Sequence, residues 1–126
     1  MLGILDTLTH EFSLDRHRLY VAGQSDGGFA VWALVANQPE RFAAAIPVCG
    51  GGDPANAARL VKVPIWAFHG DSDTVVPVTN SRRMIAAITT AGGHPRYTEY
   101  KRTGHDAWTR AFAEPELVDW LFAQHN

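Results

Sequence analysis

The chain has 126 residues, 46% of them hydrophobic, and its 11 basic and 13 acidic residues leave a formal net charge of −2. This composition is that of an ordinary globular domain, and it excludes disordered and fibrous chains. No run of lysines or arginines marks a nucleic-acid partner, and no apolar stretch approaches the roughly 20 residues that cross a bilayer. We expect one soluble domain over residues 1–126, without a nucleic-acid or membrane partner.

The first segment has the apolar spacing of a helix. Leu2, Leu5, Leu8 and Phe12 recur near helical spacing, which predicts a helix that packs its apolar stripe on a sheet. The first residues have neither the basic region nor the cleavage site of a secretory signal. The location is therefore unknown, and cytoplasmic is the default expectation.

Strands and helices alternate along the remaining sequence. Strands are predicted at residues 18–22, 42–48, 63–68 and 96–100, and helices at 28–37, 54–60, 79–91 and 115–124. Such alternation is typical of a parallel sheet with helices on both faces. The predicted fold class is therefore α/β, with about four mainly parallel strands.

Ser25 lies between the first predicted strand and the helix that follows it. Gly23 and Gly27 flank it in a G-x-S-x-G pattern, the context that a nucleophile elbow requires. Both glycines are expected to let the strand turn sharply into the helix without a Cβ clash, leaving the Ser25 hydroxyl at the apex. Ser25 is thus a candidate nucleophile, and the alternative interpretation is a simple strand-to-helix turn.

A serine nucleophile needs a base that is itself held by a third group. In a fold of this kind the order along the chain is Ser, then an acid, then His, each on a loop after a strand. Here the predicted strand at 63–68 is followed by H-G-D-S-D-T-V-V-P from His69, and the strand at 96–100 is followed by T-G-H-D-A-W from Thr103. Candidate groups for all three roles therefore follow three successive strands.

In these stretches the chain resembles the carboxyl-terminal half of an α/β-hydrolase, most like the dienelactone-hydrolase-like and predicted-peptidase esterases, near feruloyl esterases and polyhydroxybutyrate depolymerases. The matching stretches are residues 18–28, 39–47, 69–77 and 104–106. The resemblance implies a truncated or minimal α/β-hydrolase domain with Ser25 as nucleophile, Asp73 as acid and His105 as base. It implies a serine carboxylic-ester hydrolase that forms an acyl-enzyme from a small-molecule ester and needs no cofactor.

Two further aspartates compete for a role in this site. Asp71 lies in the same loop as Asp73, and its alternative role is that of a turn residue whose carboxylate binds nearby backbone N–H groups. The family spacing before Val-Pro favours Asp73. Asp106 is expected to cap the helix that begins near Ala107, and we assign it no chemistry.

Three residues near the expected reaction centre are candidates for binding the substrate. The amide N–H of Asp26, directly after the nucleophile, is the expected oxyanion donor. Gln24 and Trp108 are candidate substrate-binding residues, although an aromatic residue in the position of Trp108 is more often part of the packing.

The remaining histidines and the single cysteine are expected to be structural. His69 is predicted to be packed or hydrogen-bonded near the site, and Cys49 to be a small buried apolar residue. The sequence has no H-E-x-x-H motif and no cysteine cluster, so no metal is expected. The histidines predicted to lie on the surface are His10, His17, His94 and His125.

The strands that precede the nucleophile in this family have no counterpart in the sequence. The first predicted strand would then form a sheet edge, so we expect a homodimer, a larger oligomer, or a fragment of a longer polypeptide. The second oxyanion donor normally comes from an earlier loop, so activity is expected to be weak unless a partner chain or residues 50–53 supply it. The alternative functions are an inactive interaction module and a peptidase or thioesterase at the same site.

Overall fold

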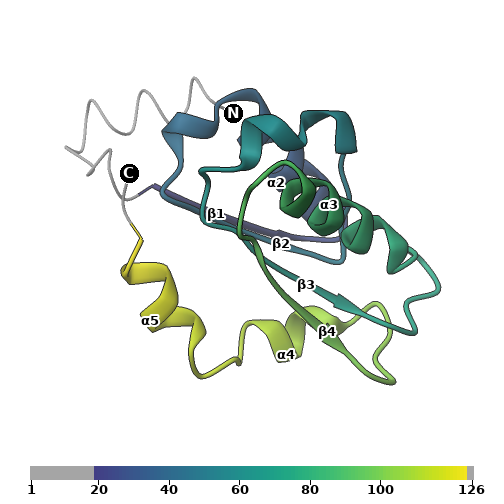
Figure 1. Cartoon of the computed structure of the whole chain (residues 1–126). Helices are drawn as coiled ribbons and strands as arrows, with labels where there is room; N and C mark the ends of the chain where they lie inside the picture. The colour runs from purple at the N-terminus through teal and green to yellow at the C-terminus, as the bar shows by residue number, and fades with distance from the viewer. Residues whose placement is uncertain (1–18, 125–126) are drawn as a thin grey trace.

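A computed structural model describes residues 19–124 (Figure 1). The predicted first helix, with Leu2, Leu5, Leu8 and Phe12, lies outside the described residues, as do His10, His17 and His125. Four parallel strands form one sheet in the order of the chain: β1 (Tyr20–Gln24), β2 (Ala44–Val48), β3 (Trp66–Gly70) and β4 (Arg96–Tyr100).

The helices cover both faces of this sheet (Figure 1). They are α2 (Asp26–Asn37), α3 (Thr79–Thr90), α4 (Ala107–Ala111) and α5 (Leu117–Phe122), with short 3-10 helices η2 (Pro39–Arg41) and η3 (Pro54–Leu60). One face carries α2, η3 and α3, whereas the other carries α4 and α5. The prediction of an α/β fold with about four mainly parallel strands is confirmed.

The strand positions differ from the prediction at three of the four strands. β1, β2 and β3 begin two or three residues later than predicted, and β3 continues through His69 and Gly70. Phe42 and Ala43 before β2 are buried without joining the ladder, and Ile65 before β3 is buried and forms only an isolated bridge to Ala45. His69 joins the β3–β4 ladder although it is polar. The hydrophobic pattern therefore indicates which residues are buried, whereas pairing with a neighbouring strand sets where each strand begins and ends.

Pro47 interrupts the pairing between the two central strands. The N–H groups of Ala45 and Cys49 donate to the carbonyls of Pro64 and Phe68 on the β3 side. Residue 47 lies between them with the same orientation, but proline has no N–H to donate. The β2–β3 ladder consequently lacks one hydrogen bond at its centre.

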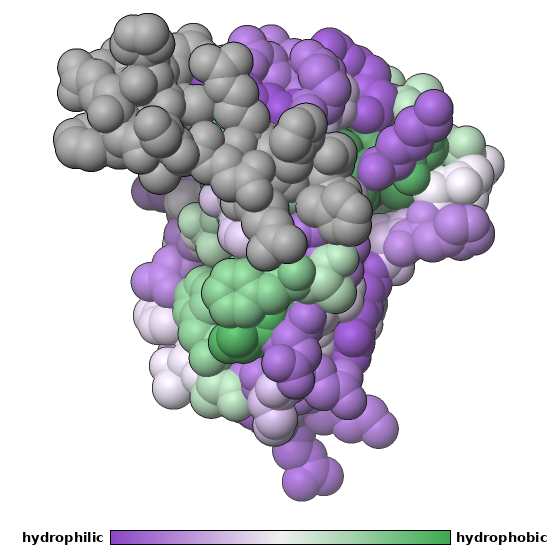
Figure 2. All heavy atoms as spheres, turned by 90° about the vertical axis from the view of Figure 1, so that its left-hand side faces the viewer, coloured by the Kyte–Doolittle hydropathy of each residue, from purple (hydrophilic) through white to green (hydrophobic). Residues whose placement is uncertain are grey.

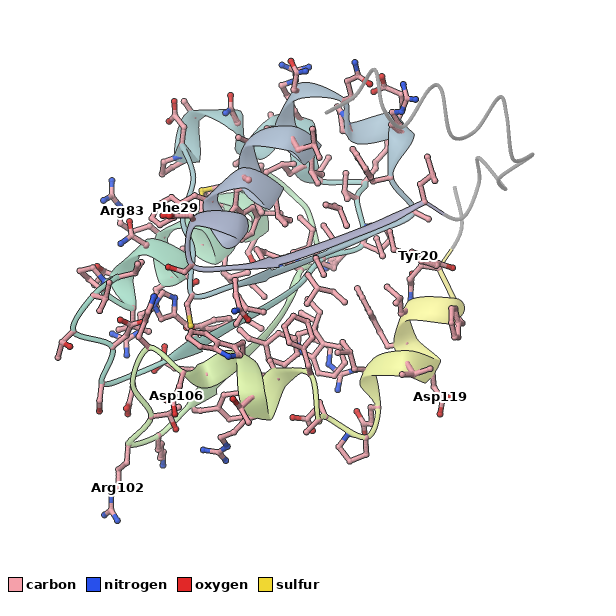
Figure 3. All side chains as sticks on the ribbon, turned by 180° about the vertical axis from the view of Figure 1, so that it is seen from behind. Tyr20, Phe29, Arg83, Arg102, Asp106 and Asp119 are labelled. Carbon is pink, nitrogen blue, oxygen red and sulfur yellow. The ribbon has the colours of Figure 1, made fainter. Side chains whose placement is uncertain are left out.

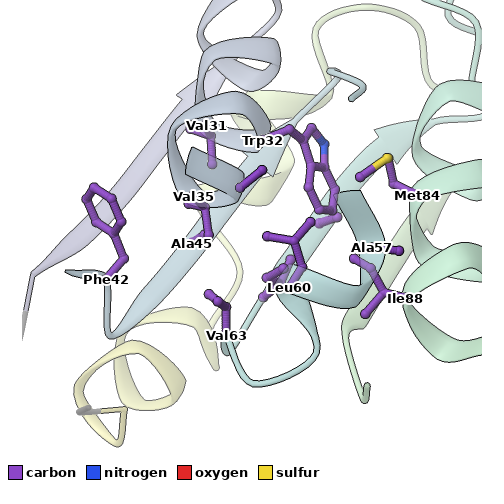
Figure 4. Close-up of a cluster of buried hydrophobic side chains, with 13 residues drawn as sticks. Val31, Trp32, Val35, Phe42, Ala45, Ala57, Leu60, Val63, Met84 and Ile88 are labelled. Atoms are coloured by element: carbon purple, nitrogen blue, oxygen red, sulfur yellow. The ribbon is translucent and has the colours of Figure 1, made fainter. Parts of the chain in front are cut away.

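The larger hydrophobic cluster lies between the sheet and the first helical layer (Figure 4). Trp32 from α2, Leu60 from η3, and Met84 and Ile88 from α3 meet there, each at most 2% exposed. Burying each of these side chains contributes about 1.5–3 kcal/mol. α3 ends at Thr90, and the φ of 105° at Gly92 allows Gly93 to donate to the Ile88 carbonyl, the closing bond of a Schellman motif.

The second layer leaves part of its apolar surface open. Val118 and Phe122 of α5 are 58% and 59% exposed, and Figure 2 shows apolar surface on the face that carries this helix. Among the described residues, no helix has the length and apolar character that a membrane span requires.

Candidate active site

The residues predicted to carry the chemistry come together at the carboxyl ends of the strands. Ser25 directly follows β1, Asp73 follows β3 and His105 follows β4. In parallel sheets the carboxyl ends meet at one edge, which is where such folds bind their ligands. In Figure 3, Phe29, Arg83 and Asp106 lie at this end of the molecule, whereas Tyr20 and Asp119 lie at the opposite end.

The backbone at Ser25 has an unusual conformation. Its φ is 55° and its ψ is −117°, a combination that costs a non-glycine residue about 1–3 kcal/mol. The Ser25 amide donates to the Val48 carbonyl at 2.9 Å, and the Ser25 carbonyl accepts from Phe29 as α2 begins. The turn from β1 into α2 is therefore fixed by neighbouring backbone on both sides of Ser25.

The two glycines that flank Ser25 differ in their importance. A Cβ on Gly23 would lie 2.4 Å from the Gly27 carbonyl oxygen, so only glycine fits there. A Cβ on Gly27 would meet no atom within 4 Å. The expected clash at Gly27 is therefore wrong, because its Cβ position faces open space.

Ser25, His105 and Asp73 form a continuous chain of short contacts. His105 Nε2 lies 2.8 Å from Ser25 Oγ, and His105 Nδ1 lies 2.7 Å from Asp73 Oδ2. A carboxylate oxygen only accepts, so Nδ1 carries the hydrogen and donates it. Nε2 of the neutral ring is then free to accept a hydrogen bond from the Ser25 hydroxyl.

Asp73 is held as a charged carboxylate although it is buried. Its Oδ1 accepts from the amides of Val75 and Val76, both at 2.8 Å. Burial alone would raise the pKa of Asp73, but the hydrogen bonds from His105, Val76 and Val75 outweigh it and lower the pKa below its ordinary value. The side chain that faces His105 is thus an anion in a fixed orientation.

The competing aspartates have other partners. Asp71 is exposed and accepts hydrogen bonds from the Arg102 amide at 2.7 Å and from the Ser72 hydroxyl at 2.9 Å. It therefore ties the loop after β3 to the turn after β4. Asp106 occupies the N-cap of α4 but makes no side-chain capping bond.

The predicted substrate-binding residues surround the turn at Ser25. Asp26 is the first residue of α2, and its amide N–H has no partner among residues 19–124, as the first amides of a helix commonly lack one. Gln24 is the exposed last residue of β1. The Trp108 ring stands edge-on to the His105 ring at 5.7 Å and also packs against the core below the sheet.

Cys49 lies directly beneath this arrangement. It is fully buried, and its Sγ lies 3.7 Å from the His105 carbonyl oxygen. Burial, followed by the nearby charge of Asp73, raises the pKa of Cys49 to about 11. Cys49, Asp73 and His105 offer ligand atoms within 4.8 Å of one another, but the protonated thiol and the His105–Asp73 hydrogen bond favour a hydrogen-bonded site over a metal centre.

His69 lies beside the site, and the sequence did not indicate which groups it would bind. It was expected to be packed or hydrogen-bonded, and it is: Nδ1 contacts Ser81 Oγ at 2.7 Å and Nε2 contacts the Val76 carbonyl at 2.8 Å. Neither partner was predicted. A polar residue in an apolar strand was the available signal for His69, whereas nothing in the sequence marked Ser81.

The chain is similar to known hydrolases in sequence and in fold. Residues 1–57 match the prolyl oligopeptidase family. A solved thermostable esterase is 39% identical, with a TM-score of 0.97 over 99% of this chain and 36% of that one. The predicted partial α/β-hydrolase fold is confirmed, and these matches support a hydrolase of the esterase type.

Other proteins that are similar to this chain are also esterases by name. The bifunctional acetylxylan esterase/xylanase XynS20E of Neocallimastix patriciarum is 31% identical over 74 residues, 58% of this chain and 11% of that protein. The solved esterase PE8 is 26% identical with a TM-score of 0.75, over 88% of this chain and 55% of that one. The chain spans less than half the length of the curated relatives it matches.

Proposed function

We propose that the chain is a serine carboxylic-ester hydrolase in which Ser25, His105 and Asp73 act as a catalytic triad. The observation that carries the proposal is the 2.8 Å contact between Ser25 Oγ and His105 Nε2, continued by the 2.7 Å contact to Asp73. The strained backbone at Ser25, at the end of a strand, supports its role as the exposed apex of a nucleophile elbow.

The proposed reaction proceeds in two steps of acyl transfer. The Ser25 oxygen attacks the ester carbonyl carbon while His105 Nε2 takes the hydroxyl proton. The alkoxide then leaves with that proton, and the acyl group remains on Ser25. Water then attacks the acyl carbon and gives a proton to His105. The bond to Ser25 Oγ breaks, His105 returns that proton to Ser25, and the acid is released, while Asp73 stabilises the imidazolium in each step.

The oxyanion of each tetrahedral intermediate needs preorganised donors. The free amide of Asp26 at the start of α2 is our candidate for one of them. The second donor would come from a partner chain or from residues 50–53. Loss of one such donor lowers the rate by about 10²–10³, so modest activity fits the proposal.

The substrate is proposed to be a small carboxylic ester. The edge-on ring of Trp108 supports an apolar wall beside His105. A peptidase is the second candidate, because residues 1–57 match the prolyl oligopeptidase family. The same triad would then attack an amide carbonyl, with His105 protonating the leaving amine.

Self-association through β1 is part of this proposal. β1 pairs with β2 on one side, and no other strand of residues 19–124 pairs with its opposite side. Unpaired strand edges invite pairing with another chain. Sedimentation at micromolar concentration should detect a dimer or larger species, and a monodisperse monomer would contradict the association.

Labelling with a fluorophosphonate probe and hydrolysis of short p-nitrophenyl esters test the function. We expect the chain to be labelled at Ser25, and the S25A variant to lose both labelling and turnover. Peptide p-nitroanilides assayed in parallel separate the esterase from the peptidase. An unlabelled, inactive chain would favour a non-catalytic interaction module instead.

A further inference from the structure

His69 is buried against the proposed triad but takes no part in the reaction described above. It lies on β3, its side chain is fully buried, and both ring nitrogens have close partners. Buried imidazoles that are hydrogen-bonded at both nitrogens have a protonation state that their partners dictate.

The partners of His69 identify its tautomer. The Val76 carbonyl oxygen can only accept, so His69 Nε2 carries a hydrogen and donates it at 2.8 Å. The Ser81 hydroxyl has one hydrogen and two possible acceptors, His69 Nδ1 at 2.7 Å and the Gly50 carbonyl at 3.4 Å. Because hydrogen bonds weaken with distance, that hydrogen is expected on the Nδ1 contact, which corresponds to the Nε2–H tautomer of His69.

The Nε2–H group closes a ring of contacts around the Asp73 carboxylate. The Val76 amide donates to Asp73 Oδ1 at 2.8 Å, while the carbonyl of the same residue accepts from His69. His69 Nε2 also lies 3.4 Å from Asp73 Oδ2, the oxygen that accepts from His105. At that distance the N–H dipole faces the carboxylate without a full hydrogen bond, and it favours the negative charge.

Building on the proposed function, we propose that His69 is a positioning residue for Asp73, held in its Nε2–H tautomer by Ser81. In the opposite tautomer a bare Nε2 lone pair would face the Val76 carbonyl and Asp73 Oδ2, both of which are negative. The loop that carries Asp73 would then have to move away from β3. Ser81 thereby links α3 to the orientation of the catalytic acid through two intervening residues.

A matched pair of amide substitutions tests this role. His69→Gln can place an N–H group where Nε2 lies, whereas His69→Asn reaches only the Nδ1 position near Ser81. We expect H69Q to keep kcat near the wild-type value and H69N to lower kcat by about 10- to 100-fold with KM little changed, because a misplacement of about 1 Å can cost about 10²-fold. S81A should lower kcat in the wild-type background and add little in H69N.

Nitrogen NMR of the labelled wild-type chain reads the tautomer without any substrate. Shifts of a neutral ring protonated at Nε2 are expected, and a ring protonated at Nδ1 would overturn the proposal even if H69N failed to fold. Equal ester turnover by folded H69Q and H69N would also overturn it, while leaving the proposed function intact. A wild-type chain that resists the fluorophosphonate probe would overturn both.

Discussion

Gly28 and Gly50 pack backbone against backbone: a Cβ on Gly50 would lie 2.5 Å from the Gly28 carbonyl carbon, and one on Gly28 would lie 2.5 Å from the Val48 carbonyl oxygen. Gly28 belongs to the first turn of α2, three residues after Ser25. The first turn of α2 therefore rests on the segment that follows β2. The position of the proposed nucleophile depends on this close approach.

Gly50→Ala should displace that first turn. We expect it to lower the free energy of unfolding by about 1–3 kcal/mol, as overpacking of a tight contact does, and to reduce ester turnover. Gly27→Ala is the matched control, since its Cβ would meet no atom within 4 Å. Alanine there should leave the stability unchanged or raise it by about 0.5–1 kcal/mol. Urea denaturation measures both, and equal losses would contradict the packing argument.

Asp73 and Asp71 lie two positions apart and should respond differently to the same change. Asp73→Asn removes the acceptor that fixes the His105 tautomer, so kcat should fall by about 10³–10⁴. Asp71→Asn keeps an oxygen that can accept from the Arg102 amide, so kcat should change little. Ester kinetics on the two folded variants check the assignment, and similar losses would speak against Asp73 as the acid.

The Arg82–Glu99 pair should make stability depend on pH. The hydrogen bond from Arg82 dominates the shift that lowers the pKa of Glu99 from 4.5 to about 2, with burial opposing it and Tyr97 adding to it. Since the folded pKa lies below the unfolded one, Glu99 stabilises the fold above pH 4.5, and this contribution is lost as the pH falls toward 2. Because the Arg82 side chain is half exposed, water screens the pair, and we expect its contribution to the free energy of unfolding to be small.

In the Glu99→Gln variant, the free energy of unfolding should fall less steeply than in the wild type as the pH is lowered from 4.5 toward 2. Asp73, whose pKa is also lowered, contributes to the slope in both proteins and cancels in the comparison. Chemical denaturation at several pH values measures the difference. Parallel curves for the variant and the wild type would count against the pair.

The indole N–H of Trp66 donates a hydrogen bond to one side chain. Its Nε1 donates to Thr98 Oγ1 at 2.9 Å from within the second hydrophobic cluster, where Trp66 is 1% exposed. Thr98→Val keeps the side-chain shape and removes the acceptor, so stability should fall by about 1–3 kcal/mol. Thr98→Ser, which keeps the hydroxyl, should retain most of it. A neutral Thr98→Val measured by urea denaturation would show that the indole finds another acceptor.

Cys49 should resist modification while the chain is folded. With a pKa raised to about 11, its thiolate fraction at pH 8 is about two orders of magnitude below that of a free thiol. Alkylation followed by mass spectrometry should therefore show slow labelling in buffer and rapid labelling in denaturant. Rapid labelling of the native chain would indicate that the thiol is exposed.

The residues of the proposed triad could be predicted because each lies in a recognisable local sequence pattern. Ser25, Asp73 and His105 each follow a recognisable strand, and parallel strands bring their carboxyl ends to one edge. The closing strand, Arg96–Tyr100, was predicted with the same bounds because its ends coincide with the change in pattern.

The contacts that support these residues could not be predicted in this way. Ser81 meets His69 only because α3 packs against the sheet, and no local pattern in α3 records that approach. The free space at Gly27 likewise depends on what lies opposite the helix, whereas the motif treats the two flanking glycines alike.

Residues with a positive φ lower the thermal stability of this fold at one edge of the sheet. Among residues 19–124, the non-glycine residues with positive φ are Ser25, Cys49 and Arg102, and each comes within two positions after a strand. Conformational strain of about 1–3 kcal/mol at each is thus concentrated on one rim of the sheet. Substitutions that relieve this strain should raise the thermal stability most readily at that rim. At position 25 such a substitution would also lower the ester turnover.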